Sequence, residues 1–80
     1  MAHRILARIR SVNDARSPAI ITTDNGTFQM QRRMPKVAYR QLLRKANDVA
    51  GTGELCALRY VPQKAQSGSR HTLLDIAILG

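Results

Sequence analysis

The residues of this sequence that offer the most chemistry are its arginines. Thirteen Lys and Arg stand against five Asp and Glu, which gives a formal net charge of +8, and ten of the thirteen cations are Arg. A guanidinium forms planar, bidentate hydrogen bonds to phosphate and carboxylate groups. So large a charge repels itself, and a partner of opposite sign relieves that repulsion. The composition therefore predicts a polyanionic ligand, with a charge that only aids solubility as the alternative.

The cations are also clustered along the chain. The predicted phosphate contacts are Arg4, Arg8, Arg10, Arg32, Arg33, Lys36, Arg40 and Arg44. The first three belong to one expected strand, and the last three recur every four residues on one face of an expected helix. No acidic residue stands four positions from Lys36 or Arg40, and Arg44 has only Asp48, so the pairing that would make this helix face self-contained is mostly missing. The strand and helix faces form either one groove or two separate patches.

Further candidate contacts lie in loops and on aromatic side chains. Arg16 falls in the first loop, and Lys64 and Arg70 fall in a long polar loop over residues 62–71. Tyr39 and Tyr60 are the candidate platforms for stacking a base. With one Phe, two Tyr and no Trp in the chain, an extended stacking surface is not expected.

The sequence predicts no catalytic residue, no metal site and no cofactor. His3, His71 and Cys56 follow no known ligand spacing, and the carboxylates are scattered. Cys56 is expected to pack as a small apolar group. Asp75 interrupts an apolar run, so it is expected to be buried against a cation such as Arg59 in a structural ion pair. We therefore expect a protein that is not an enzyme.

Hydrophobic periodicity predicts five strands and one helix. Alternation predicts a strand over 3–12, with Ile5, Ala7 and Ile9 on one face. The dipeptide Asn25-Gly26 predicts a hairpin with a type I′ turn. The other expected strands cover 19–24, 27–31, 54–61 and 72–79, and the expected helix covers 35–50.

The pattern within these elements predicts what faces the core. Phe28 and Met30 are expected to point inward, and Thr27, Gln29 and Gln31 outward. Pro35 suits the first turn of the helix, and Gly51 or Gly53 suits a left-handed C-terminal cap. The last strand is almost continuously apolar, which is typical of a central strand or of one covered on both faces. The expected apolar stripe of the helix is Ala38, Leu42, Ala46, Val49 and Ala50, widened by Leu43.

The expected fold class is α+β, with the order β-β-β-α-β-β in a single domain over residues 1–80. This order resembles the OB-fold, a small Greek-key barrel. The resemblance implies that the first and last loops, which hold Arg16, Lys64 and Arg70, flank the binding face. The alternative is an open five-stranded antiparallel sheet with the helix packed across it.

These observations predict a nucleic-acid-binding module that contacts the phosphate backbone with weak sequence specificity, single-stranded DNA or RNA being slightly favoured over duplex. The alternative is a protein-interaction or inhibitor module that docks on an acidic protein surface. A homodimer through the edge of the last strand is compatible with either. No run of residues is long and apolar enough for a membrane span, the N-terminus has no signal-peptide pattern, and a single cysteine suits a reducing cytoplasm.

Overall fold

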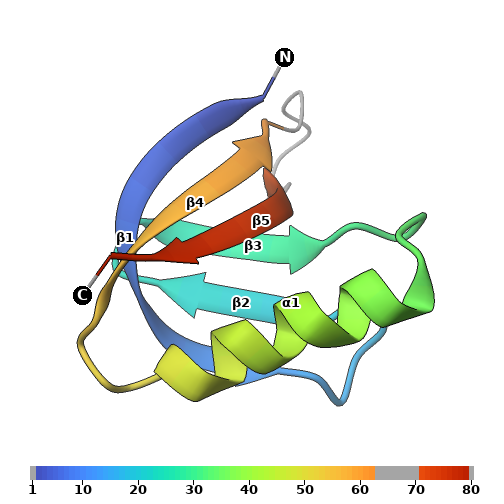
Figure 1. The fold of residues 1–80 in the computed structure, drawn as a ribbon, viewed down its shortest axis with the longest axis horizontal. Coiled ribbons are helices and arrows are strands. Elements are labelled where there is room, and N and C mark those ends of the chain that lie inside the picture. The colour runs from blue at the N-terminus through green and yellow to red at the C-terminus, as the bar shows by residue number, and fades with distance from the viewer. Residues whose placement is uncertain (1, 63–70, 80) are drawn as a thin grey trace.

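The described residues form one helix and five strands, as expected for a small α+β protein. The computed structural model describes residues 2–62 and 71–79. Along the chain these elements are β1 (His3–Asn13), β2 (Ile20–Thr23), β3 (Gly26–Met30), α1 (Lys36–Val49), β4 (Leu55–Val61) and β5 (His71–Ile78) (Figure 1). Of the expected loop over residues 62–71, residues 63–70, which include Lys64 and Arg70, lie outside the described residues, and His71 already belongs to β5.

The five strands close into a barrel in the order β1-β2-β3-β5-β4. β1 makes closure possible because it is 11 residues long and pairs with two partners in succession. Its first half, from His3 to Arg8, pairs with β4, and its second half, from Ile9 to Asn13, pairs with β2. The register shifts between Ile9 and Ser11, and such an irregularity bends a strand and increases its twist.

The expectation of a purely antiparallel sheet is wrong at one pairing. β3 and β5 run parallel, with Phe28 opposite His71 and Met30 opposite Leu73. Parallel neighbours need a long crossover connection, and here α1 and β4 together supply it. On its other side β5 pairs with β4 over most of its length, whereas β3 pairs with only residues 71–73, so a homodimer through the edge of the last strand stays a prediction.

The β2–β3 hairpin is present, but its turn is not the one expected. Asp24 and Asn25 form the tip, and β3 begins at Gly26. Among the described residues no residue other than glycine has a positive φ, whereas a type I′ turn needs one at Asn25. Gly26, at φ 115°, carries the unusual backbone conformation alone. The Thr23 hydroxyl donates to the Gly26 carbonyl at 2.8 Å and accepts from the Asn25 amide at 3.0 Å, which stabilises this shifted turn.

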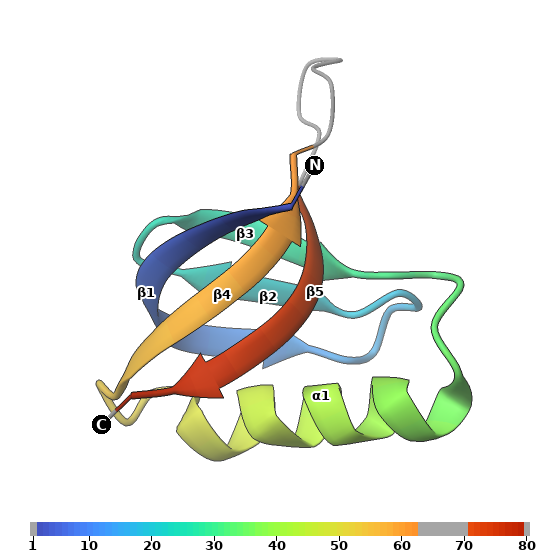
Figure 2. The ribbon, with the colours of Figure 1, turned by 45° about the horizontal axis from the view of Figure 1, so that its top comes forward.

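The core fills the barrel, and α1 covers one end of it (Figure 2). Strand alternation places the inward residues, and the expected inward orientation of Phe28 and Met30 is confirmed. Leu42, Ala46 and Val49 of α1 are buried, but Ala38 is exposed. Tyr39 packs against the core instead, and its hydroxyl accepts a hydrogen bond from the Ala19 amide. The buried apolar residues are Ala7, Ile9, Ala19, Ile21, Phe28, Met30, Leu42, Ala46, Val49, Cys56, Leu58, Leu73 and Ile76.

The ends of α1 are fixed by neighbouring backbone. Pro35 is the N-terminal flanking residue rather than part of the first turn, and its carbonyl accepts from the Tyr39 amide at 2.9 Å. Gly51 follows the helix at φ 75°, a left-handed conformation as expected there. Its amide donates to the Ile9 carbonyl at 3.0 Å, so the C-terminal end of the helix is tied to the bend in β1.

Candidate nucleic-acid interface

The lysine and arginine side chains of the described residues are all exposed, and the fold separates them into groups. The densest group combines Arg32 and Arg33, which follow β3, with Lys36 and Arg40 at the start of α1. We call these four residues the Arg32 cluster. It lies at the N-terminal end of α1, where the chain passes from β3 into the helix (Figure 1).

Two hollows open onto the Arg32 cluster and share Arg32. The first has a volume of about 360 Å³ and is lined by Ser17, Arg32, Met34, Lys36, Tyr39 and Arg40. The second has a volume of about 400 Å³ and is lined by Gln29, Met30, Gln31, Arg32, Arg33 and Thr72. Because Arg32 borders both, the cluster connects the loop between β1 and β2 with the outer face of β3 and β5.

The local structure that builds the first hollow depends on Tyr39. Its hydroxyl accepts a hydrogen bond from the Ala19 amide at 2.9 Å, and its half-buried ring packs on the core. This contact holds the end of the β1–β2 loop against α1, which brings Ser17 beside Lys36 and Arg40. Tyr39 is therefore a structural anchor that borders the hollow, and the prediction that it offers a free stacking platform is not supported by its position.

In the part of the chain that the structure describes, no carboxylate forms an ion pair with the Arg32 cluster. Neither hollow is lined by an acidic residue, and the first turn of α1 contains none. Across residues 2–62 and 71–79, the ion pair that forms is between Arg8 and Asp24, and neither residue belongs to the cluster. Four unpaired cations on adjacent segments repel one another, so an anion bound among them would remove an unfavourable interaction.

Arg8 and Arg10 form a second group at the other end of α1. They share a hollow with Asp24, Gly51 and Gly53. Arg8 is held in place, because its guanidinium lies 4.0 Å from the Asp24 carboxylate and its Nε–H donates to the Gly53 carbonyl at 3.1 Å. A 14-residue helix spans about 20 Å, so this group and the Arg32 cluster are distinct patches rather than one groove.

The remaining predicted cations lie elsewhere. Arg4 stands on the outer face of β1, directly opposite Arg59 of β4. Arg16 is exposed in the β1–β2 loop, and Arg44 is exposed one helical turn beyond Arg40. The two predicted contacts of the last loop, Lys64 and Arg70, lie outside the described residues.

Tyr60 lies near the C-terminal end of β4, and this end of the strand points away from α1 (Figure 2). It belongs to a cluster of rings. Its ring meets the buried ring of Phe28 edge-on at 5.4 Å and lies 4.9 Å from the ring of His71. The His3 ring stacks on Tyr60 at 5.8 Å. Tyr60 is half-buried in this cluster, and its ring contributes to the packing at this end of the barrel.

Two sequence-based interpretations of single residues have different outcomes. Cys56 is fully buried in β4, as expected. Burial raises the pKa of its thiol, and the nearby negative charge of Glu54 raises it further. Asp75 lies opposite Arg59 as expected, but it is exposed rather than buried, and no ion pair joins the two side chains. Its carboxylate accepts from the Ile76 amide at 2.8 Å instead. Within residues 2–62 and 71–79 no three His, Cys, Asp or Glu residues gather as metal ligands.

Sequence reasoning did not select the polar residues that border the hollows, Ser17, Gln29 and Gln31. The outward alternation of Gln29 and Gln31 along β3 was the signal for two of them, whereas the position of Ser17 depends on a tertiary contact.

Comparison with protein-family models, with curated proteins and with solved structures finds no match to this chain. In the described part of the chain, no helix has the length and apolar character needed to cross a membrane.

Proposed function

We propose that this protein is a non-enzymatic nucleic-acid-binding module, with single strands favoured over duplex and weak sequence specificity. The observation that carries the proposal is the Arg32 cluster: four exposed cations from two adjoining segments border two connected hollows that no carboxylate lines. Phosphate groups are the ligands that such a cluster suits, because a polyanion satisfies all four cations at once.

The architecture supports the same proposal. We infer that the five-stranded barrel is OB-like, and in that fold class the face of strands two and three, with the loop between strands one and two, binds oligonucleotides. The outer residues of β2 and β3 are half-buried and uncharged: Ile20, Thr22, Thr27 and Gln29. The second hollow reaches this face at Gln29. A strand could therefore lay its bases over β2 and β3 while its phosphates contact the Arg32 cluster.

The chemistry of the outer face favours unpaired bases. The side-chain amides of Gln29 and Gln31 can both donate and accept hydrogen bonds, which suits base edges that only an unpaired strand exposes. No aromatic side chain other than Tyr39 borders the hollows, so the guanidinium planes of Arg32 and Arg33 would supply part of the stacking. Stacking on guanidinium planes and contacts to phosphates discriminate little between bases, which is why we propose weak sequence specificity.

The test is fluorescence anisotropy of labelled single-stranded DNA, duplex DNA and RNA, titrated with the protein at roughly 50 and 200 mM salt. We expect a single strand to bind at micromolar strength or better, and to lose at least an order of magnitude in affinity between the two salt concentrations. Tighter binding of duplex would contradict the preference for single strands. Absence of binding to every nucleic acid at the lower salt concentration would overturn the proposal.

A further inference from the structure

A second surface of different chemistry lies on the outer faces of β1, β4 and β5. The pairing register aligns Arg4 with Arg59, and Arg59 with Asp75, in one row across the three strands. The neighbouring row is apolar and consists of Leu6, Ala57 and Ala77. We call this surface, together with Leu79, the β4 face.

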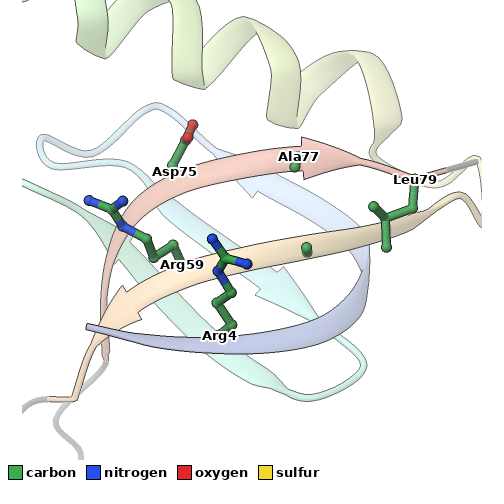
Figure 3. Close-up of a pocket in the computed structure, with 6 residues that line it drawn as sticks. Arg4, Arg59, Asp75, Ala77 and Leu79 are labelled. Atoms are coloured by element: carbon green, nitrogen blue, oxygen red, sulfur yellow. The ribbon is translucent and has the colours of Figure 1, made fainter. Parts of the chain in front are cut away.

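The two leucines of the β4 face are largely exposed to solvent. Leu6 is 53% exposed and Leu79 is 56% exposed. Because Ala57 and Ala77 between them are small, the strands leave a hollow of about 230 Å³ bordered by Arg4, Arg59 and Asp75 (Figure 3). Two exposed leucines beside a floor of alanines form a place for an apolar side chain of another molecule.

The charges around this hollow are arranged unfavourably in the isolated protein. Arg4 and Arg59 are directly opposite each other on adjacent strands, an arrangement of like charges that destabilises a sheet. Neither guanidinium forms an ion pair with any acidic side chain of residues 2–62 and 71–79. Asp75 does not offset the two cations at close range, and its Oδ1 is occupied by the Ile76 amide. A carboxylate from another molecule would fit between the two guanidiniums.

We propose that the β4 face docks an acidic protein segment that presents an apolar side chain flanked by carboxylates. The apolar side chain would enter the hollow over Ala57 and Ala77, and a carboxylate would bridge Arg4 and Arg59. This proposal does not depend on nucleic-acid binding, because it concerns different residues.

Charge and composition argue against the other occupants. A second copy of this chain carries +8 and would bring two more arginines to the face for each aspartate, so the contact would be repulsive. Nucleic acid would place phosphates near Asp75 and bases over aliphatic side chains, since no aromatic residue lines the hollow. An acidic partner with an apolar residue would pair with Arg4 and Arg59 and would also pack against Ala57 and Ala77.

The test uses the full chain and a synthetic peptide in which a pair of leucines is flanked by glutamates. Two matched peptides replace the leucines with serine or the glutamates with glutamine. Binding is followed by amide chemical-shift changes of the isotope-labelled protein. We expect shifts centred on residues 4–6, 57–59 and 75–79, and at least about tenfold weaker binding by either matched peptide.

Matched protein variants locate the site. Leu6→Ser and Arg59→Ser should each weaken peptide binding about tenfold. Val37→Ser and Arg44→Ser remove an exposed apolar residue and an exposed cationic residue from α1, and each should leave peptide binding unchanged. All four positions are at the surface, so a thermal melt is expected to show folded protein in each case.

Three results would overturn the proposal. They are no binding at millimolar peptide, shifts centred on α1, and equal binding by the glutamine peptide. Self-association that Leu6→Ser abolishes would assign the face to a second copy and would equally refute an acidic partner. None of these results affects the nucleic-acid titration, so the two proposals fail independently.

Discussion

Neutralising the Arg32 cluster should change how nucleic-acid affinity depends on salt. The variant Arg32→Gln, Lys36→Gln, Arg40→Gln removes three cations that border one hollow. Gln has a helix propensity close to those of Lys and Arg, and all three side chains are exposed, so folding is expected to be preserved. If each cation neutralises one phosphate of a single strand, the slope of log affinity against log salt becomes shallower by about 2.

That slope corresponds to a measurable difference. Over a rise from roughly 50 to 200 mM salt, the unmodified protein should lose about 20-fold more affinity than the triple variant. The assay is anisotropy of a labelled single-stranded oligonucleotide, titrated at several salt concentrations across that range.

The control removes the same amount of charge from other faces. Arg4→Gln, Lys45→Gln, Arg59→Gln also takes away three of the eight net positive charges, but none of these residues borders the two hollows. This control should retain nearly the full salt slope. If both triple variants lose the same slope, binding follows net charge alone, and the assignment to the Arg32 cluster is wrong.

Three further predictions concern stability. Tyr39→Phe leaves the buried Ala19 amide without its acceptor and should lower the free energy of unfolding by about 1–3 kcal/mol in urea titrations. The raised pKa of Cys56 means that the folded state favours the neutral thiol. The resulting contribution to the free energy of unfolding is complete below the ordinary pKa of 9.0 and is lost as pH rises through the pKa of the folded state. The drop in stability as pH rises above 9.0 should thus be smaller in Cys56→Ala. Phe28→Ala should cost about 3–5 kcal/mol, visible as a large loss of thermal stability by circular dichroism, because Phe28 is 1% exposed.

Local patterns in the sequence predict most elements of this fold. Alternation along residues 3–12 and 27–31 predicts which side chains of β1 and β3 face inward, since the period of two is a property of the strand itself. The parallel pairing of β3 with β5 is not predictable in this way, because it joins Phe28 to His71 across α1 and β4. The half-burial of Tyr39 in place of Ala38 is likewise not predictable locally, because Tyr39 contacts Ala19, a residue of a distant segment.

The candidate site shows the same division. The four members of the Arg32 cluster are predicted from charge and helical spacing, because they lie within nine residues of one another in the chain. Arg8 is a weaker candidate than its sequence suggests, since Asp24 and Gly53 engage its guanidinium. Those partners are 16 and 45 residues away in the chain, so no local pattern reveals that they occupy it.

The separation of the two surfaces has a consequence for how partners would combine. The Arg32 cluster borders β3 and the start of α1, whereas the β4 face lies on β1, β4 and β5, on a molecule 32 × 25 × 23 Å in extent. The hollow of the β4 face shares no lining residue with the two hollows of the Arg32 cluster, and salt screening, with a Debye length of about 8 Å at physiological salt, weakens coupling between charges that are not in contact. An acidic peptide on the β4 face should therefore leave nucleic-acid affinity nearly unchanged, measured by anisotropy at saturating peptide. Strong competition would instead mean that the peptide occupies the Arg32 cluster, because only a shared set of cations couples two anionic ligands that strongly.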